Sequence, residues 1–293
     1  MFIGTALLRT RNPLAALLVA LPLAVAGCSA PSAPEDSAPA AANFGHVHGI
    51  SVDPRSSRIL LATHTGLYDV SGKSAVKISD TAIDLMGFTG TAEPNVFYAS
   101  GHPGPDSPLP NPVGLIRSDD AGKTWRTVSR AGRSDFHALT GSGDGLVAYD
   151  GQLHTSLDGT NWTTSAATFA PAVLAGSPVS AAVLATTQEG LQRSVDHGKS
   201  WGLVEGAPIM QFVAFAGSAD KAPVVAAGVT PDGAVHVSLD AGLSWTAAGR
   251  VTDHVEAIAA TEGADGKPCI WAATTGGVHV STDGGETFHP AAL

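Results

Sequence analysis

The strongest constraint on the fold is a motif that recurs along the chain, Ser-x-Asp-x-Gly-x-Thr/Ser-Trp. It occurs five times, and its serines are spaced 38, 38, 44 and 43 residues apart. The second copy is one residue short, and the last ends in Phe instead of Trp. A repeat period of about 40 residues is typical of proteins whose units each contain four strands. We call these copies the turn repeats; they occupy residues 118–125, 156–162, 194–201, 238–245 and 281–288.

A sixth unit is indicated at the start of the repeated region. Most turn repeats follow a short segment that begins with glycine, and the same kind of segment occurs at Gly66-Leu67-Tyr68 without the motif. Dividing the 250 residues of 44–293 by six gives about 42 residues per unit, whereas seven units would leave about 36, which is short for four strands and their turns. The sequence therefore predicts an all-β fold, a single β-propeller of four-stranded blades, with six blades favoured and seven as the alternative.

The turn repeat has a structural explanation. Ser and Asp side chains accept hydrogen bonds from backbone amides in turns, Gly permits a positive φ, and the Trp ring offers a large surface for packing between sheets. We therefore expect the aspartates of the motif to be structural residues and not catalytic ones. They are Asp120, Asp158, Asp196, Asp240 and Asp283.

The turn repeat resembles the Asp box, or BNR repeat, of sialidases, sortilin-type receptors and xyloglucanases. In those families the box joins the third and fourth strands of a propeller blade, away from the active centre. Residues 44–293 are similar to bacterial exported Asp-box lipoproteins of the glycosylhydrolase-like kind. The segments that carry this resemblance are 45–50, 85–88, 99–103 and 135–139. The resemblance implies a fold and not an activity.

The N-terminal region reads as an export signal followed by a tether. Arg9 and Arg11 precede an apolar stretch at 14–26, which is too short for a comfortable membrane span. It ends in Val25-Ala26-Gly27-Cys28, which resembles a bacterial lipobox, so we expect a signal peptide at 1–27 and a lipidated Cys28. The Pro/Ala/Ser-rich segment 28–43 is predicted to be a flexible tether. The domain 44–293 is then expected at the extracytoplasmic face of the cell membrane, held there by lipid.

Composition excludes one class of partner. The chain has 26 acidic and 16 basic residues, a formal net charge of −10; loss of Arg9 and Arg11 with the signal leaves 14 basic residues and a charge of −12. Such a domain does not suit nucleic acid. With Cys28 lipidated, Cys269 is the one remaining cysteine of the sequence, so a disulfide within the chain is not expected. We expect a monomer.

The innermost strand of each unit lies about 30 residues before its turn repeat and lines the central channel of a propeller. When these strands are aligned by sequence, their first and third positions fall on one face. The first positions are His46, Asp84, Asp135, Pro171, Gln211 and His254, and the third are His48, Met86, His137, Val173, Val213 and Glu256. His64 and His102 end second strands, and we expect them near the same rim.

Histidine together with methionine in an exported protein favours a soft or borderline metal ion, copper first and zinc next. The predicted ligands are His46, His48, Met86, His137, His64 and His102. The alternative is that these polar side chains line a wet channel and hydrogen-bond to one another. The leading functional hypothesis is thus a membrane-tethered propeller, non-enzymatic, that binds a metal ion or a small ligand at its channel.

Two other functions stay open at this stage. A glycoside hydrolase, either sialidase-like or using two carboxylates, would employ Asp84, Asp135 and Glu256. The sequence lacks the Arg-Ile-Pro motif of sialidases, which weighs against that mechanism. The third hypothesis is a docking platform for exported proteins. A metal ion, a glycan or an exported protein is accordingly the expected partner.

Overall fold

The computed structural model describes residues 45–53, 55–79, 81–105, 107–217, 224–263 and 266–291. All of them belong to one structural unit, Pro39–Leu293. The predicted signal peptide, Cys28 and the tether lie outside the described residues. Every extended regular element in the described ranges is a β-strand, and no helix there is long and apolar enough to cross a membrane. The prediction of an all-β fold is confirmed.

The strands form four sheets of four strands and one sheet of eight. We call the four-stranded sheets A to D, and the two halves of the eight-stranded sheet E and F. Sheet A contains β1 (Val47–Asp53), β2 (Arg58–Thr63), β3 (Gly66–Asp69) and β4 (Val76–Lys77). Sheet B contains β5 (Ile83–Gly90), β6 (Phe97–Pro103), β7 (Leu115–Ser118) and β8 (Arg126–Ser129). Sheet C contains β9 (Ala138–Ser142), β10 (Gly145–Tyr149), β11 (Leu153–Ser156) and β12 (Thr163–Thr164).

Sheet D contains β13 (Val173–Gly176), β14 (Val183–Thr187), β15 (Gly190–Ser194) and β16 (Gly202–Leu203). Half-sheet E contains β17 (Phe212–Gly217), β18 (Ala226–Val229), β19 (Ala234–Ser238) and β20 (Thr246–Arg250). Half-sheet F contains β21 (Val255–Glu262), β22 (Pro268–Thr274), β23 (Gly277–Ser281) and β24 (His289–Pro290). E and F are joined by parallel pairing of β17 with β21, at Ala216↔Ala260 and Gly217↔Thr261.

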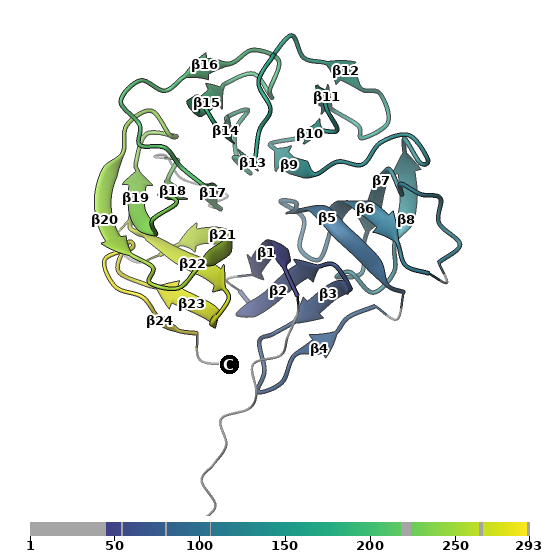
Figure 1. The fold of residues 1–293 in the computed structure, drawn as a ribbon, viewed down its shortest axis with the longest axis horizontal. Coiled ribbons are helices and arrows are strands. Elements are labelled where there is room, and N and C mark those ends of the chain that lie inside the picture. Colours follow the sequence, from purple (N-terminus) through teal and green to yellow (C-terminus); the bar gives the residue numbers. More distant parts are fainter. Residues whose placement is uncertain are drawn as a thin grey trace, which may run out of the picture. The chain divides into compact units, whose positions relative to one another are not determined.

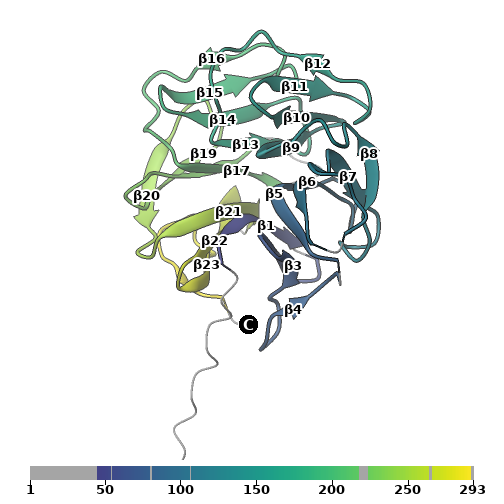
Figure 2. The ribbon, with the colours of Figure 1, turned by 45° about the vertical axis from the view of Figure 1, so that its right-hand side comes forward.

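The sheets are arranged around a central opening, with the first strand of each innermost and the fourth outermost (Figures 1 and 2). Each first strand contacts the first strand of the next sheet, and β1 contacts β21, so the ring closes between sheets A and F. The innermost strands approach each other closely: a Cβ on Gly176 of β13 would lie 1.9 Å from the carbonyl oxygen of Gly141 on β9. This is the predicted propeller-like arrangement of four-stranded sheets.

Each turn repeat joins the third and fourth strands of its sheet. In sheet D, Ser194 Oγ accepts a hydrogen bond from the Gly198 N–H at 2.8 Å and donates one to Asp196 at 2.8 Å. Asp196 in turn accepts from the N–H of Ser200 at 2.9 Å. The turn thus satisfies its backbone amides with two side chains from the motif, as the sequence predicted.

The glycine and the aromatic residue of the turn repeat contact the preceding sheet. Gly242 has φ +86°, and a Cβ there would lie 2.6 Å from Leu184 of sheet D. Trp245 packs into the apolar cluster between D and E, which contains Leu184 and Leu191. The motif therefore selects glycine both for its backbone conformation and for the space that the neighbouring sheet leaves.

Candidate metal centre

The predicted histidines gather at one mouth of the central opening. His46 and His48 stand at the start of β1, Asp84 at the start of β5, and Asp135 and His137 just before β9. In an antiparallel sheet the start of the first strand lies beside the end of the second, so His64 after β2 and His102 near the end of β6 belong to the same mouth. Sheets A, B and C therefore supply the side chains together.

Bulges in the innermost strands help to place these side chains. Strand β1 pairs Val47 with Thr63 and Gly49 with Ala62, which leaves His48 outside the ladder. The same irregularity falls at Met86 in β5 and at Glu256 in β21. In sheet C the His137 N–H donates to the carbonyl of Tyr149, which is also the partner of Ala138. A bulge re-aims the side chain that it carries and is common next to functional sites.

The aligned third positions are thus equivalent in sheets A, B, C and F, as the sequence predicted, but not in D and E. There the equivalent residues are Ala172 and Gln211, whose N–H groups donate to the carbonyls of Thr186 and Val229. The alignment that placed Val173 and Val213 in this column was wrong by one and two residues. Neither replacement is a metal-ligand side chain of the kind found in A to C, so the site is confined to one side of the opening.

The first group of side chains, which we call site one, consists of His48, His64 and Asp84. The His48 Nε2 lies 3.1 Å from His64 Nδ1 and 3.5 Å from Asp84 Oδ1, and the His64 Nδ1 lies 3.0 Å from the same carboxylate oxygen. Burial, and then the charge of His64, lower the pKa of His48 to about 4, against the opposing effect of Asp84. The His48 imidazole is therefore neutral at ordinary pH, the state in which histidine binds a metal ion.

The second group, site two, consists of His102, Asp135 and His137. Asp135 Oδ2 lies 3.0 Å from His102 Nε2 and 2.6 Å from His137 Nε2. On its other side the His102 ring bonds through Nδ1 to Asn111 Oδ1, at 2.8 Å. This hydrogen bond raises the pKa of His102, helped by the charges of Asp135 and Asp84 and opposed by burial.

His46 and Met86 lie outside these two groups. His46 Nδ1 bonds to Glu256 Oε1 of half-sheet F at 3.0 Å, and its ring meets that of His48 edge-on, with centroids 4.9 Å apart. Burial alternates along β5: Leu85 and Gly87 are buried, and Met86 between them is half-buried. Met86 is therefore on the same face of the strand as Asp84. The three carboxylates considered for glycoside hydrolysis, Asp84, Asp135 and Glu256, are each bonded to at least one histidine.

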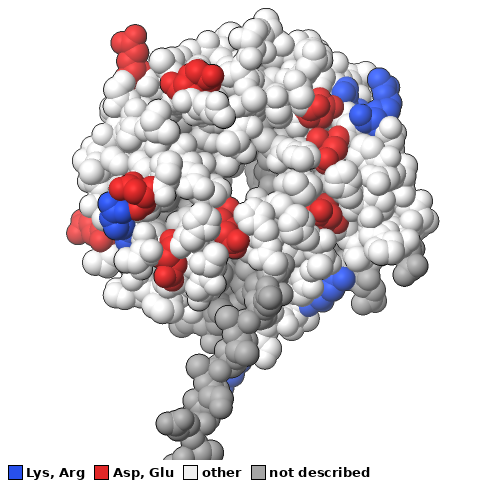
Figure 3. Space-filling model, in the orientation of Figure 1, with Lys and Arg blue, Asp and Glu red and all other residues white. Residues whose placement is uncertain are grey.

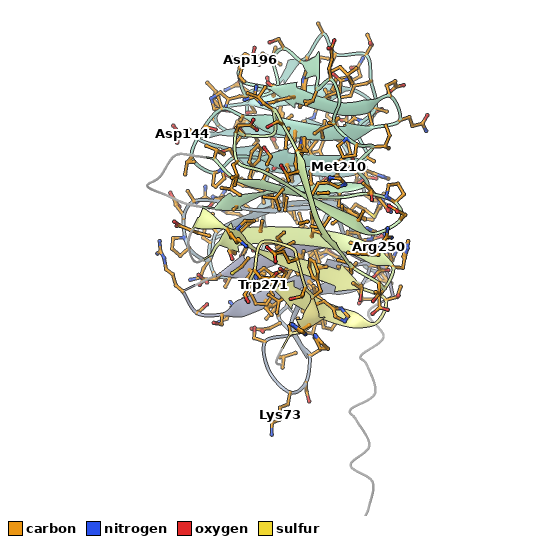
Figure 4. The ribbon with its side chains drawn as sticks, turned by 90° about the vertical axis from the view of Figure 1, so that its left-hand side faces the viewer. Lys73, Asp144, Asp196, Met210, Arg250 and Trp271 are labelled. Atoms are coloured by element: carbon orange, nitrogen blue, oxygen red, sulfur yellow. The ribbon has the colours of Figure 1, made fainter. Side chains whose placement is uncertain are left out.

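On the face shown in Figure 3, acidic side chains occur beside the opening and also at the outer edge, whereas the basic ones visible there lie away from the opening. A cavity of about 600 Å³ occupies the channel further along the innermost strands, where its walls include Ile50, Phe88, Leu139, Leu174 and Ile258. The histidines are not part of its lining. The turn repeats lie at the opposite face from the histidines, because the third strand of a sheet runs parallel to the first and each turn repeat follows its end. In Figure 4, Asp196, in the turn repeat of sheet D, and Asp144, in the turn after β9, lie on one side of the ring. Arg250, which ends β20 just before β21 begins, lies on the other side.

The donor atoms of site one have the spacing of a metal ligand set. Ligands at 2.0–2.1 Å from a tetrahedral zinc ion are separated by about 3.3 Å, and the three separations here are 3.0, 3.1 and 3.5 Å. Two imidazole nitrogens and one carboxylate oxygen suit zinc or copper(II).

No protein-family profile matches the sequence, and no curated protein shows significant similarity to it. Solved structures resemble the fold. A GH74 enzyme from Niastella koreensis aligns with a TM-score of 0.56 and 18% identity over 84% of this chain and 37% of its own. An ancestral GH74 enzyme gives 0.53 and 12% over 84% and 38%. A chain of a nidogen–laminin complex gives 0.59 and 12% over 79% and 91%. The likeness is one of β-propeller fold, and this chain spans less than half the length of the GH74 chains.

Proposed function

We propose that this chain is a membrane-tethered β-propeller that binds a transition-metal ion outside the cell membrane, at one mouth of its channel. The observation that carries the proposal is the convergence of His48 Nε2, His64 Nδ1 and Asp84 Oδ1 at ligand spacing, from two different sheets. Burial supports it, because a neutral His48 needs no deprotonation before it binds a metal ion.

Zinc and copper(II) are the ions that this donor set favours. The sequence-based order, copper before zinc, depended on the thioether of Met86. Site one instead offers two nitrogens and one oxygen, and such ligands suit Zn²⁺ or Cu²⁺ better than the softer Cu⁺. Three protein ligands leave a fourth position for water or a small ligand.

We further propose that the ring has six blades. Half-sheets E and F are each a four-stranded antiparallel meander, and in the described residues the backbone pairing between them consists of two parallel residue pairs. Counting them as two blades gives the number that the period of the turn repeats predicts. The Asp-box character of those repeats and the lipid anchor at Cys28 belong to the same proposal, which places the metal site outside the cell membrane.

Metal titration of the purified full-length protein in detergent tests the proposal. After chelation, isothermal titration with Zn²⁺ and with Cu²⁺ is expected to show saturable binding. His64→Ala is expected to weaken it by roughly 100-fold, since even the loss of an outer-shell partner costs 10–100-fold. His236→Ala, which removes a histidine from β19 in half-sheet E, is the matched control and should bind as the parent does.

Two results would contradict the proposal. One is the absence of Zn²⁺ and Cu²⁺ binding by the folded parent protein. The other is binding that His64→Ala leaves unchanged. Hydrolysis of aryl glycosides without bound metal, abolished by Asp135→Asn, would support the hydrolase hypothesis in its place, and a stoichiometric exported partner would support the docking hypothesis.

A further inference from the structure

We infer that His102, Asp135 and His137 bind a second metal ion, so that sites one and two together form a two-metal centre. The inference rests on the proposed function and extends it, because site one alone would suffice for a protein that binds a single ion. Four observations carry it: the geometry of site two, an unpartnered oxygen within it, the orientation of His102, and its position next to site one.

Site two repeats the composition of site one with residues from neighbouring sheets. Each contains two histidines and one aspartate, and in each the ligand atoms lie within 4.8 Å of one another. The Asp135 Oδ2 is 3.0 Å from His102 Nε2 and 2.6 Å from His137 Nε2. Two imidazoles meeting on one carboxylate oxygen is an arrangement that a cation between the three groups would stabilise.

The second oxygen of Asp135 has no partner of its own. Oδ1 is buried and makes no hydrogen bond with the described part of the chain. A buried carboxylate oxygen without a donor is unfavourable, because that oxygen has lost its hydration without gaining a hydrogen bond. A metal ion bound at Asp135 would compensate this charge directly.

Asn111 fixes the ring nitrogen that His102 presents. Because Asn111 Oδ1 can only accept, its 2.8 Å hydrogen bond requires the proton to be on His102 Nδ1. His102 Nε2 faces Asp135, which also only accepts, at 3.0 Å and donates its proton there in the metal-free protein; a metal ion between the two groups would replace that proton and bind the Nε2 lone pair. Outer partners of this kind commonly orient histidine ligands at metal sites.

The two sites adjoin through a cross-strand pair. Asp84 of site one and His102 of site two are direct partners in the ladder between β5 and β6. Side chains so placed have Cβ atoms about 4.5–5.5 Å apart. Electrostatic interaction already links the groups, since the charge of Asp84 acts on His102 and that of His137 acts on His48. Ions in the two sites would therefore be close neighbours, as in two-metal centres of other proteins.

Charge balance permits two ions at this mouth. Two divalent ions bring four positive charges, and Asp84, Asp135 and Glu256 supply three negative ones nearby. Among the described residues, the ion pairs of these three carboxylates are with histidines and not with Lys or Arg. The four histidines of the two sites bind metal as neutral ligands, so they add no positive charge against a second cation.

The number of ions per chain tests the inference on the full-length protein. We expect two equivalents of Zn²⁺ by titration and elemental analysis. His137→Ala and His64→Ala should each bind one equivalent, having lost a different site. With Cu²⁺, the electron paramagnetic resonance spectrum of the parent should show dipolar broadening at two equivalents, and both variants should give the spectrum of an isolated ion. His236→Ala should retain two equivalents and the broadening.

The possible failures are distinguishable. One equivalent that His64→Ala abolishes and His137→Ala leaves intact would overturn the two-metal centre while the proposed function stands. One equivalent that both substitutions abolish would mean a single ion shared between the groups, which also overturns it. The absence of binding by the folded parent would overturn both. His137→Gln, with nearly conserved volume, and thermal unfolding of each variant separate ligand loss from misfolding.

Discussion

Among the histidines in the described part of the chain, His48 has the most strongly shifted pKa. It faces His46 and His64 from its own sheet, Asp84 from sheet B and His137 from the segment before β9. Burial and the three histidines disfavour its protonated form, and Asp84 alone opposes them. Its pKa is lowered from 6.5 to about 4.

This shift predicts how the stability of the metal-free protein depends on pH. Between about pH 6.5 and pH 4 the unfolded chain has a protonated His48 and the folded chain a neutral one, so unfolding takes up a proton. The contribution of His48 should therefore be fully present above pH 6.5 and be lost as the pH falls through this window. His48→Gln should flatten the fall. NMR titration of the ring should give a midpoint near 4, and a midpoint near 6.5 would contradict the prediction.

His102 is shifted in the opposite direction, mainly because of its hydrogen bond to Asn111. A raised pKa stabilises the fold below the unfolded value of 6.5, and that contribution is lost as the pH rises through the folded value. His48 and His102 therefore respond to pH with opposite signs, which lets NMR distinguish these two histidines before any metal is added.

At the scale of the element, the turn repeats offer a matched pair of serines. Ser194 is 2% exposed and accepts the Gly198 N–H at 2.8 Å. In the shorter second copy, Ser156 is 5% exposed, and its Oγ contacts only Asp158, whose carboxylate instead accepts from the N–H groups of Thr160 and Asn161. One motif therefore depends on its serine for a buried backbone amide and the other does not.

Ser194→Ala is expected to lower the free energy of unfolding by about 1–3 kcal/mol, because it leaves the buried Gly198 N–H without an acceptor. Ser156→Ala should cost less, about 1 kcal/mol or under, since it removes a hydrogen bond to the Asp158 carboxylate and a long one, 3.4 Å, from the Asp158 N–H, and strands no glycine amide. Urea denaturation of the two variants checks the difference. Equal losses would mean that the serine contributes through packing and not through the turn.

Structure that depends on residues close together in the chain could be predicted from the sequence, and structure that depends on a partner strand could not. The hydrogen bonds within a turn repeat join residues two to four positions apart, so the motif and its spacing contain the structure. The register of an innermost strand depends on a bulge against its partner strand, which no local pattern specifies. The innermost strands of A, B, C and F were aligned correctly because residues such as His, Met and Asp identify their positions. The innermost strands of D and E, β13 and β17, are apolar, and their alignment was wrong.

The candidate site also combines features that a local sequence pattern predicts with contacts that it does not. Its histidines were predicted because two columns of a repeated strand converge in a propeller. The choice of partners was not: His48 bonds to His64 across 16 residues, and His46 to Glu256 across 210. Asn111, in the loop between β6 and β7, was not predicted at all, since nothing in its surroundings resembles a metal site. Asp84 and Asp135, candidates for catalysis only under the hydrolase hypothesis, lie beside the histidines, on the face where the aligned first positions put them.

For the molecule as a whole, the closure between the first and last sheets is the distinctive feature. All neighbouring sheets except A and F are consecutive in the chain, so a covalent connection links them, and E and F also share backbone pairing. Sheets A and F are held by an apolar cluster that includes Leu61, Val47 and Val278, and by the hydrogen bond from His46 to Glu256. In the described residues no strand is exchanged between them. This seam is therefore the interface that can separate with the least loss of other structure.

Leu61→Ala should show that the seam between A and F opens more readily than the other interfaces between sheets. Leu61 is 2% exposed within the seam cluster, and Leu191, 1% exposed, occupies the cluster between D and E. Truncation of either is expected to cost about 2–5 kcal/mol. In native-state hydrogen exchange, Leu61→Ala should accelerate exchange in β1, β2, β22 and β23 while sheets C and D keep their protection. Leu191→Ala should lower protection throughout, because opening between D and E also strains a covalent connection. Uniform loss of protection in both variants would mean that the closed ring unfolds as one unit, with a seam as strong as its other interfaces.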